Sequence, residues 1–213
     1  MEQVPPYRAK VRYDDQKSAQ YNQRSPQRHR AEMELLEPAL RRFTAGSSVL
    51  DVPCGAGRVS VRLAELGMRV TAADISDAML AITREKLARV QPPARVVLGD
   101  AEKLGFPDRS FDGAVCFRFF HHLPTDELRA AVVSELCRVS ERLVVLSFFH
   151  PYSPAMIQRR VQTKLFGQPQ RRFPIHPSRL HELFRPHRFR CVSLAGQSGY
   201  FRSLWLAVYE RQR

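Results

Sequence analysis

The sequence of 213 residues predicts an α/β fold, with a doubly wound, mostly parallel sheet of seven strands and one antiparallel strand pair at its edge. Two observations support this class. Short apolar runs alternate with segments of helical periodicity between residues 47 and 150, as they do in successive βαβ units. Near the end of the chain, two strand-like runs follow one another without a helix between them, which favours an antiparallel edge.

The length predicts a single domain, and we expect it to have three parts. Residues 1–46 form a helical N-terminal cap, and residues 47–150 form a core that binds a cofactor. Residues 151–213 form a basic segment on the substrate side, together with the two closing strands.

Each element has its own signal. Apolar positions recur at helical spacing over residues 28–43, and the run 48–52 is a strand that ends in a glycine turn. The strand 69–74 leads into a helix, for which Asp77 is the better N-cap candidate. The remaining predicted elements are a helix over 78–90, strands over 94–98 and 111–117, a helix over 125–139, a strand over 142–149, helices over 154–166 and 178–184, and strands over 189–194 and 203–209.

The glycine turn is the most informative motif. Gly55 and Gly57 lie between a buried strand and a helix, so backbone N–H groups reach the carboxyl end of the strand, where open α/β sheets bind nucleotide-like ligands. A dinucleotide fingerprint would need a third glycine at the position of Ser60. Asp51, just before the turn, instead offers a carboxylate that can pair with a cationic amino group.

Two further acids follow the next two strands. Asp74 ends the second strand, where a carboxylate can accept hydrogen bonds from ribose hydroxyls. A helix cap is the other interpretation of Asp74, but its place at a strand end after a glycine turn favours binding. Asp100 and Ala101 follow the third strand in the same way.

Together these segments resemble the class I S-adenosylmethionine-dependent methyltransferases of the small-molecule and quinone-biosynthesis type. The resemblance covers about residues 45–150 and includes a fourth-strand motif that runs from Phe111 and Asp112 to a histidine near the strand end; Pro53 replaces the family's first glycine. It implies a Rossmann-like fold, S-adenosyl-L-methionine as cofactor, and an enzyme that transfers methyl groups. The positions carried over as cofactor-binding are Asp51, Pro53, Cys54, Gly55, Gly57, Asp74, Ile75, Asp100, Ala101 and Phe117.

Two histidines are the candidate catalytic residues. His121 and His122 lie just past the fourth strand, and a side chain with a pKa near working pH can accept a proton from an acceptor hydroxyl. The alternative is a structural role, in which the imidazole bonds a loop backbone and holds the cofactor wall. His150, after the fifth strand, is a second candidate on the substrate side.

The acceptor is expected among the irregular basic segments. Residues 151–213 carry twelve Lys/Arg and two Asp/Glu, whereas residues 47–150 carry thirteen of each. Arginine grips phosphate or carboxylate in a bidentate fork, so we expect a small or lipid-linked, anionic acceptor. The alternative is a solvated basic surface that follows from the Arg-rich composition. The resemblance implies that the N-terminal segment folds over the acceptor, and this places Tyr13 and Tyr21 on the substrate side.

The helix predicted over residues 154–166 has three possible placements. It could be a lid, it could rest on an anionic membrane surface, or it could pack on the sheet, and we favour the last. Arg159 and Arg160 are its candidate substrate-side residues. Its expected apolar stripe consists of Met156, Ile157, Val161 and Leu165, opposed by Arg159, Arg160 and Lys164.

Several function classes find no support. No signal peptide or apolar run of membrane-spanning length is visible, and the four cysteines show no metal-ligand spacing, so we expect a cytoplasmic protein without a metal. An RNA methyltransferase remains an alternative because of the basic tail, although Phe117-Arg118-Phe119-Phe120 stands where an amino-group methylase of nucleic acids would show an Asn/Asp-Pro-Pro-Tyr/Phe tetrad. A non-catalytic cofactor-binding regulator is the third hypothesis.

Overall fold

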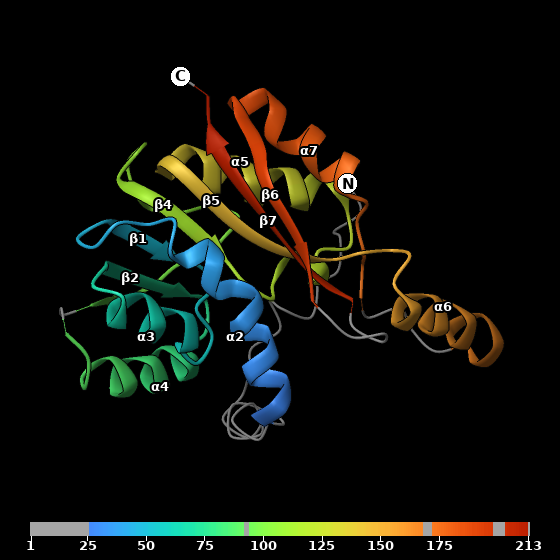
Figure 1. Cartoon of the computed structure of the whole chain (residues 1–213), viewed down its shortest axis with the longest axis horizontal. Helices are drawn as coiled ribbons and strands as arrows, with labels where there is room; N and C mark the ends of the chain where they lie inside the picture. Colours follow the sequence, from blue (N-terminus) through green and yellow to red (C-terminus); the bar gives the residue numbers. More distant parts are fainter. Residues whose placement is uncertain (1–25, 92–93, 168–171, 198–202, 213) are drawn as a thin grey trace.

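The computed structural model describes residues 26–91, 94–167, 172–197 and 203–212 (Figure 1). The strands are β1 (Ser48–Asp51), β2 (Arg69–Asp74), β3 (Arg95–Leu98), β4 (Phe111–Cys116), β5 (Ser140–Phe149), β6 (Phe189–Gly196) and β7 (Leu204–Arg211). The helices are α2 (Pro26–Leu40), α3 (Arg58–Glu65), α4 (Asp77–Leu87), α5 (Asp126–Val139), α6 (Pro154–Phe166) and α7 (Pro177–Phe184), with 3-10 turns η1 (Phe120–His122) and η2 (Arg185–His187).

One sheet of seven strands runs through the molecule in the order β3-β2-β1-β4-β5-β7-β6. The five strands from β3 to β5 pair in parallel, and β7 pairs antiparallel with both β5 and β6. The predicted fold class is therefore confirmed. Because the parallel strands point the same way, the sheet has one edge of carboxyl ends and one edge of amino ends.

Apolar layers cover both faces of the sheet. Val49 and Leu50 are neighbours on β1 but pack into opposite layers, as alternate residues of a strand must. One layer includes apolar side chains of α2, α3 and α4, and the other includes those of α5 and α7, in agreement with their placement in Figure 1. Burial on both faces explains why the central strands read as continuous apolar runs.

The start of α4 corrects one sequence prediction. Ser76, not Asp77, is the N-cap: its hydroxyl accepts a hydrogen bond from the Met79 backbone N–H at 3.4 Å, and its own backbone is extended. Asp77 is already the first helical residue, so it cannot provide the extended cap conformation.

The preferred placement of α6 was also wrong. Met156 is 3% exposed, but Ile157, Val161 and Leu165 are 48%, 50% and 70% exposed, and α6 extends away from the sheet (Figure 1). The reason is geometric, since adjacent residues are about 100° apart around a helix. Burying Met156 against the body turns the stripe of Ile157, Val161 and Leu165 away from it.

Candidate functional site

The sheet reverses its strand order between β1 and β4. The chain proceeds from β1 to β2 and β3 on one side, and from β4 to β5 on the other. The crevice outside the carboxyl ends of two such strands is where open α/β sheets bind ligands. The backbone N–H of Val52 donates to the Val115 carbonyl at 2.9 Å, so the two strand ends are held together at this point.

The glycine turn follows β1 at this crevice. Gly55 and Gly57 have φ angles of 53° and 75°, the left-handed region that glycine adopts without strain. A Cβ atom on Gly57 would lie 2.8 Å from Thr83 Oγ1, and that hydroxyl donates to the Gly55 carbonyl at 2.8 Å. Helix α4 thus holds the turn in a shape that excludes a side chain at position 57.

Asp74 connects the end of β2 to the glycine turn. Its Oδ2 accepts the Gly55 N–H at 2.8 Å, and its Oδ1 accepts the Ser76 N–H at 2.9 Å. Burial raises the pKa of Asp74, although the hydrogen bonds from Ser76 and Gly55 oppose this effect. Each carboxylate oxygen has a second lone pair, so the side chain can accept further hydrogen bonds from ribose hydroxyls. Beside it, Ile75 presents an apolar side chain that is 41% exposed.

Asp51 lies at the end of β1 and is almost completely buried. The Ser60 hydroxyl donates to its Oδ2 at 2.6 Å, which gives a role to the serine at the position of the absent third glycine. Burial raises the pKa of Asp51 to about 7, and the charge of Asp74 adds to the effect. A cationic group at this carboxylate would reverse the shift, because an opposite charge favours the ionised form.

The other predicted cofactor positions lie along the same edge. Ala101 and Phe117 are buried, and Asp100 is half-buried, with its Oδ1 accepting the Glu102 N–H at 3.0 Å. Pro53 is half-buried and follows a cis peptide bond. Cys54 is buried, and burial raises the pKa of its thiol far above neutrality, so it cannot act as a thiolate nucleophile.

Sequence reasoning missed a charged cluster beside this site. Glu32 of α2 is buried and forms ion pairs with Arg58 at 2.6 Å, Arg118 at 2.5 Å and Arg28 at 3.1 Å. Burial acts to raise the pKa of Glu32, but the charges of Arg118 and Arg58 outweigh this effect and lower the pKa overall. Arg58 follows the glycine turn and Arg118 follows β4, so Glu32 ties α2 to both segments. The available signal was a glutamate one helical turn before Leu36, on the buried face of α2.

The two histidines of η1 lie in different surroundings. The His121 ring is fully buried, stacks on Phe149 at 3.9 Å between ring centroids, and has no hydrogen-bond partner for either nitrogen among the described residues. Burial and the nearby charges of His122 and Arg118 lower its pKa, so the imidazole is neutral near pH 7. His122 is half-buried and has Arg172 Nη1 3.0 Å from its Nε2.

His150 lies at the end of β5 within a group of aromatic rings that the sequence did not single out. It stacks on Trp205 at 4.6 Å and lies 5.9 Å from the rings of both Tyr152 and His176. Burial and the charge of His176 lower the pKa of His150. These rings form a surface suited to a flat ligand.

The remaining substrate-side predictions lie elsewhere. Arg159 and Arg160 are exposed on α6, which Figure 1 shows extending away from the sheet, so the structure does not bring them to the glycine turn. Tyr13 and Tyr21 fall outside the described residues. Within the described ranges, no cluster of three His, Cys, Asp or Glu side chains could hold a metal ion, and no helix has the length and apolar character to cross a membrane.

The part of the chain that resembles known proteins contains the glycine turn and the acids that follow the strands. Residues 49–142 match the family described as a methyltransferase domain. The chain is 36% identical to the demethylmenaquinone methyltransferase of Tropheryma whipplei over 109 residues, covering 51% of this chain and 44% of that protein. It is 30% identical to the magnesium-protoporphyrin O-methyltransferase of Synechocystis over 155 residues, covering 73% of this chain and 63% of that one. This chain therefore aligns with about half the length of its relatives.

The fold has close counterparts among solved structures. Magnesium protoporphyrin IX methyltransferase from Synechocystis PCC 6803, crystallised with bound SAH, superposes with a TM-score of 0.74 at 21% identity, over 86% of this chain and 83% of that one. A protein from Methanosarcina mazei, described as a SAM-dependent methyltransferase, has a TM-score of 0.70 at 19% identity, over 82% and 97% of the two chains.

Proposed function

This chain belongs to the class I S-adenosylmethionine-dependent methyltransferases, and we propose that it transfers a methyl group from S-adenosyl-L-methionine to a small or lipid-linked, anionic acceptor. The observation that carries the proposal is the pair of buried carboxylates, Asp51 and Asp74, around a glycine turn that cannot accommodate a side chain. The N–H groups of Gly55 and Gly57 are already bonded within the protein, so two acids beside this turn suit a nucleoside that carries a cationic amino group better than they suit a pyrophosphate.

Each part of the cofactor has candidate partners in this arrangement. Asp51 would pair with the amino group of the methionine moiety, and Asp74 would accept hydrogen bonds from the ribose hydroxyls. Ile75 provides an exposed apolar side chain beside Asp74, suited to one face of the adenine, with Asp100 and Ala101 on the side of its polar edge. The bound cofactor supplies a sulfonium methyl group that is already electrophilic, so the protein has mainly to align the acceptor and exclude water.

His121 is the candidate general base. Its ring is neutral, so one nitrogen has a free lone pair, and neither nitrogen has a partner among the described residues. An acceptor hydroxyl that reaches this nitrogen could give up its proton as the new bond to the methyl group forms. His122 contacts Arg172 and is better placed to bind an anionic group of the acceptor than to take its proton.

The acceptor is expected at the aromatic group around His150. Relatives of this chain are named as quinone and porphyrin methyltransferases, and a flat ring system would stack on His150, Trp205 and Tyr152. The exposed stripe of α6 adjoins Arg159 and Arg160, the pattern of a helix that lies on an anionic membrane surface. We infer a cytoplasmic enzyme that reaches a lipid-linked acceptor from the membrane surface.

Titration calorimetry tests cofactor binding directly. We expect micromolar binding of S-adenosylmethionine and of its demethylated product, and no binding of a nicotinamide dinucleotide. Asp74→Ala should weaken binding by about 1–3 kcal/mol through lost hydrogen bonds to a charged group. Asp77→Ala is the matched control, since Asp77 is exposed on the first turn of α4. Unchanged binding by Asp74→Ala would overturn the placement of the ribose.

Transfer of a labelled methyl group in a whole-cell extract, with the lipid and RNA fractions then separated, tests the reaction. His121→Asn should lower turnover about 100-fold or more, the usual contribution of a general base, with cofactor affinity unchanged. His122→Asn should instead raise KM for an anionic acceptor. Label that enters RNA and not the lipid fraction would replace this acceptor class with a nucleic acid.

A further inference from the structure

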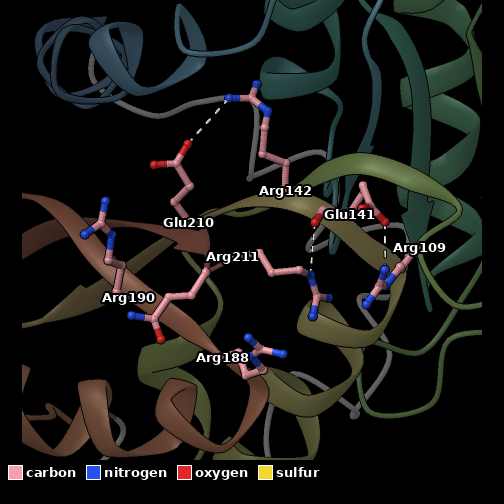
Figure 2. Close-up of a pocket in the computed structure, with 8 residues that line it drawn as sticks. Arg109, Glu141, Arg142, Arg188, Arg190, Glu210 and Arg211 are labelled. Atoms are coloured by element: carbon pink, nitrogen blue, oxygen red, sulfur yellow. Dashed lines mark hydrogen bonds and ion pairs between the residues drawn. The ribbon is translucent and has the colours of Figure 1, made fainter.

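A basic depression lies at the opposite edge of the sheet from the glycine turn. It has a volume of about 770 Å³ and is formed where β4 and β5 begin, β6 begins and β7 ends (Figure 2). Its five arginines and two glutamates give a net charge of +3. The lining residues are Arg109, Glu141, Arg142, Arg188, Arg190, Glu210, Arg211 and Gln212.

Arg211 is held in a fixed position in this depression. Its Nη2 donates to the backbone carbonyls of Cys137 at 2.6 Å and Ser140 at 2.8 Å, and its guanidinium lies 4.5 Å from the centre of the Phe189 ring. Burial lowers the pKa of Arg211, and the like charges of Arg109 and Arg188 lower it further. An anion between these guanidinium groups would stabilise them.

The two glutamates do not neutralise the depression. Arg109 Nε lies 3.6 Å from Glu141 Oε2, and Arg142 Nη1 lies 3.8 Å from Glu210 Oε1. Both distances exceed the roughly 2.7–2.9 Å of a strong charge-assisted hydrogen bond. Arg190 is exposed and forms no ion pair with any other described residue. Donors therefore remain for an external anion.

The backbone gives a second, independent observation. Arg109 and Arg188 have φ angles of 51° and 60°, and Arg118 is the third described residue other than glycine in the left-handed region. Glycine adopts this conformation without strain, whereas a residue with a Cβ incurs a cost in stability. Arg188 adopts it as the residue that ends η2, and both arginines bring their side chains to the same depression.

We propose that this depression binds a chain of phosphate groups, as in tripolyphosphate or a nucleoside triphosphate. Guanidinium groups converge on it from several segments, and phosphate oxygens accept their bidentate hydrogen bonds. The described lining has no aromatic side chain on which a base could stack, so the phosphates and not the nucleoside carry the recognition. A compact depression favours a short polyphosphate over the extended track that RNA needs.

Calorimetric titration of the full chain at constant ionic strength tests the proposal, with tripolyphosphate, pyrophosphate, phosphate and ATP as probes. We expect affinity to rise from phosphate to tripolyphosphate, and ATP to bind no more tightly than tripolyphosphate. Arg190→Gln and Arg188→Gly should each weaken tripolyphosphate binding about tenfold, through lost charge-assisted hydrogen bonds. Because glycine suits the left-handed conformation, Arg188→Gly should not lower the melting temperature, so its loss of binding would not reflect unfolding.

Arg89→Gln is the matched control, because Arg89 is exposed beyond the end of α4 and pairs with Glu85. If this variant loses as much affinity as Arg190→Gln, the binding is a general effect of net charge and the proposal is wrong. Tighter binding of RNA than of tripolyphosphate, at equal phosphate concentration, would also overturn it. Cofactor affinity should be the same in all these variants, so the result is independent of the methyltransferase proposal.

Discussion

Replacing Asp51 with asparagine should make the protein more stable and abolish its affinity for the cofactor. The aspartate is buried, and its pKa is raised from 3.8 to about 7, first by burial and further by the charge of Asp74. Asparagine has nearly the same shape, can still accept the Ser60 hydrogen bond through its carbonyl oxygen, and carries no charge.

The size and direction of the effect follow from proton linkage. A carboxyl with a raised pKa binds its proton more tightly in the folded than in the unfolded protein, so the free energy of unfolding falls as pH rises from about 4 to about 7. At about 1.4 kcal/mol per pKa unit, the shift corresponds to about 4 kcal/mol above pH 7. Asparagine avoids this cost, and after allowing for a weaker bond to Ser60 we expect a gain of about 2–4 kcal/mol at pH 8. Most of the gain should be lost near pH 4, where the aspartate is neutral in the folded protein and about half ionised in the unfolded one.

Urea unfolding between pH 4 and pH 8.5, followed by circular dichroism, measures this difference. Asp77→Asn is the control, because it removes the same charge from an exposed position and should change stability little at any pH. Calorimetry on the same samples should show that wild-type affinity for S-adenosylmethionine rises with pH through 7, while Asp51→Asn shows no detectable binding at any pH. A stability difference that does not vary with pH would refute the reasoning, because the buried carboxyl would then not be the titrating group.

Three further substitutions test other parts of the structure. Glu32→Gln leaves two half-buried arginines without their buried counter-charge and should lower the free energy of unfolding by about 3 kcal/mol. In the same urea titration, exposed Glu34→Gln should change it by less than about 0.5 kcal/mol. Gly57→Ala introduces both a left-handed alanine and a clash with α4, so it should lower the free energy of unfolding by about 2–3 kcal/mol and weaken cofactor binding. Gly46→Ala is its control: no atom lies near its Cβ position, so it should show only the backbone cost of about 1 kcal/mol. Leu165→Gln should reduce the fraction of protein that sediments with anionic vesicles by several-fold without lowering the melting temperature. Equal sedimentation of this variant and the wild type would exclude α6 as the membrane contact.

The core of the fold could be predicted because its signals are local. The glycine turn, the acids at strand ends and the alternation of strands and helices each lie within a few consecutive residues, and strand direction then brings them to one edge. Ser60 shows the limit of such reasoning. The sequence used it to exclude a dinucleotide fingerprint, but only the fold shows its hydroxyl 2.6 Å from Asp51.

The features that escaped prediction depend on pairs of residues far apart in the chain. Glu32 meets Arg118 across 86 positions, and no periodicity in either segment specifies that contact. The basic depression combines residues from Arg109 to Gln212, so its charge is dispersed in the sequence and concentrated only in space. The apolar stripe of α6 was visible, but the orientation of the helix depends on which of its side chains the body buries.

Two features at the carboxyl edge lower the stability of the free protein, and together they argue for a bound ligand there. The Asp51 carboxyl is buried with a raised pKa, and both nitrogens of the buried His121 ring lack partners among the described residues. An apolar side chain at either position would avoid the cost of burying a polar group. Such costs are reasonable where a ligand offsets them, with a cationic amino group at the carboxylate and a hydroxyl at the imidazole. If Asp51→Asn is more stable and no longer binds the cofactor, the carboxylate is there for the ligand and not for the fold.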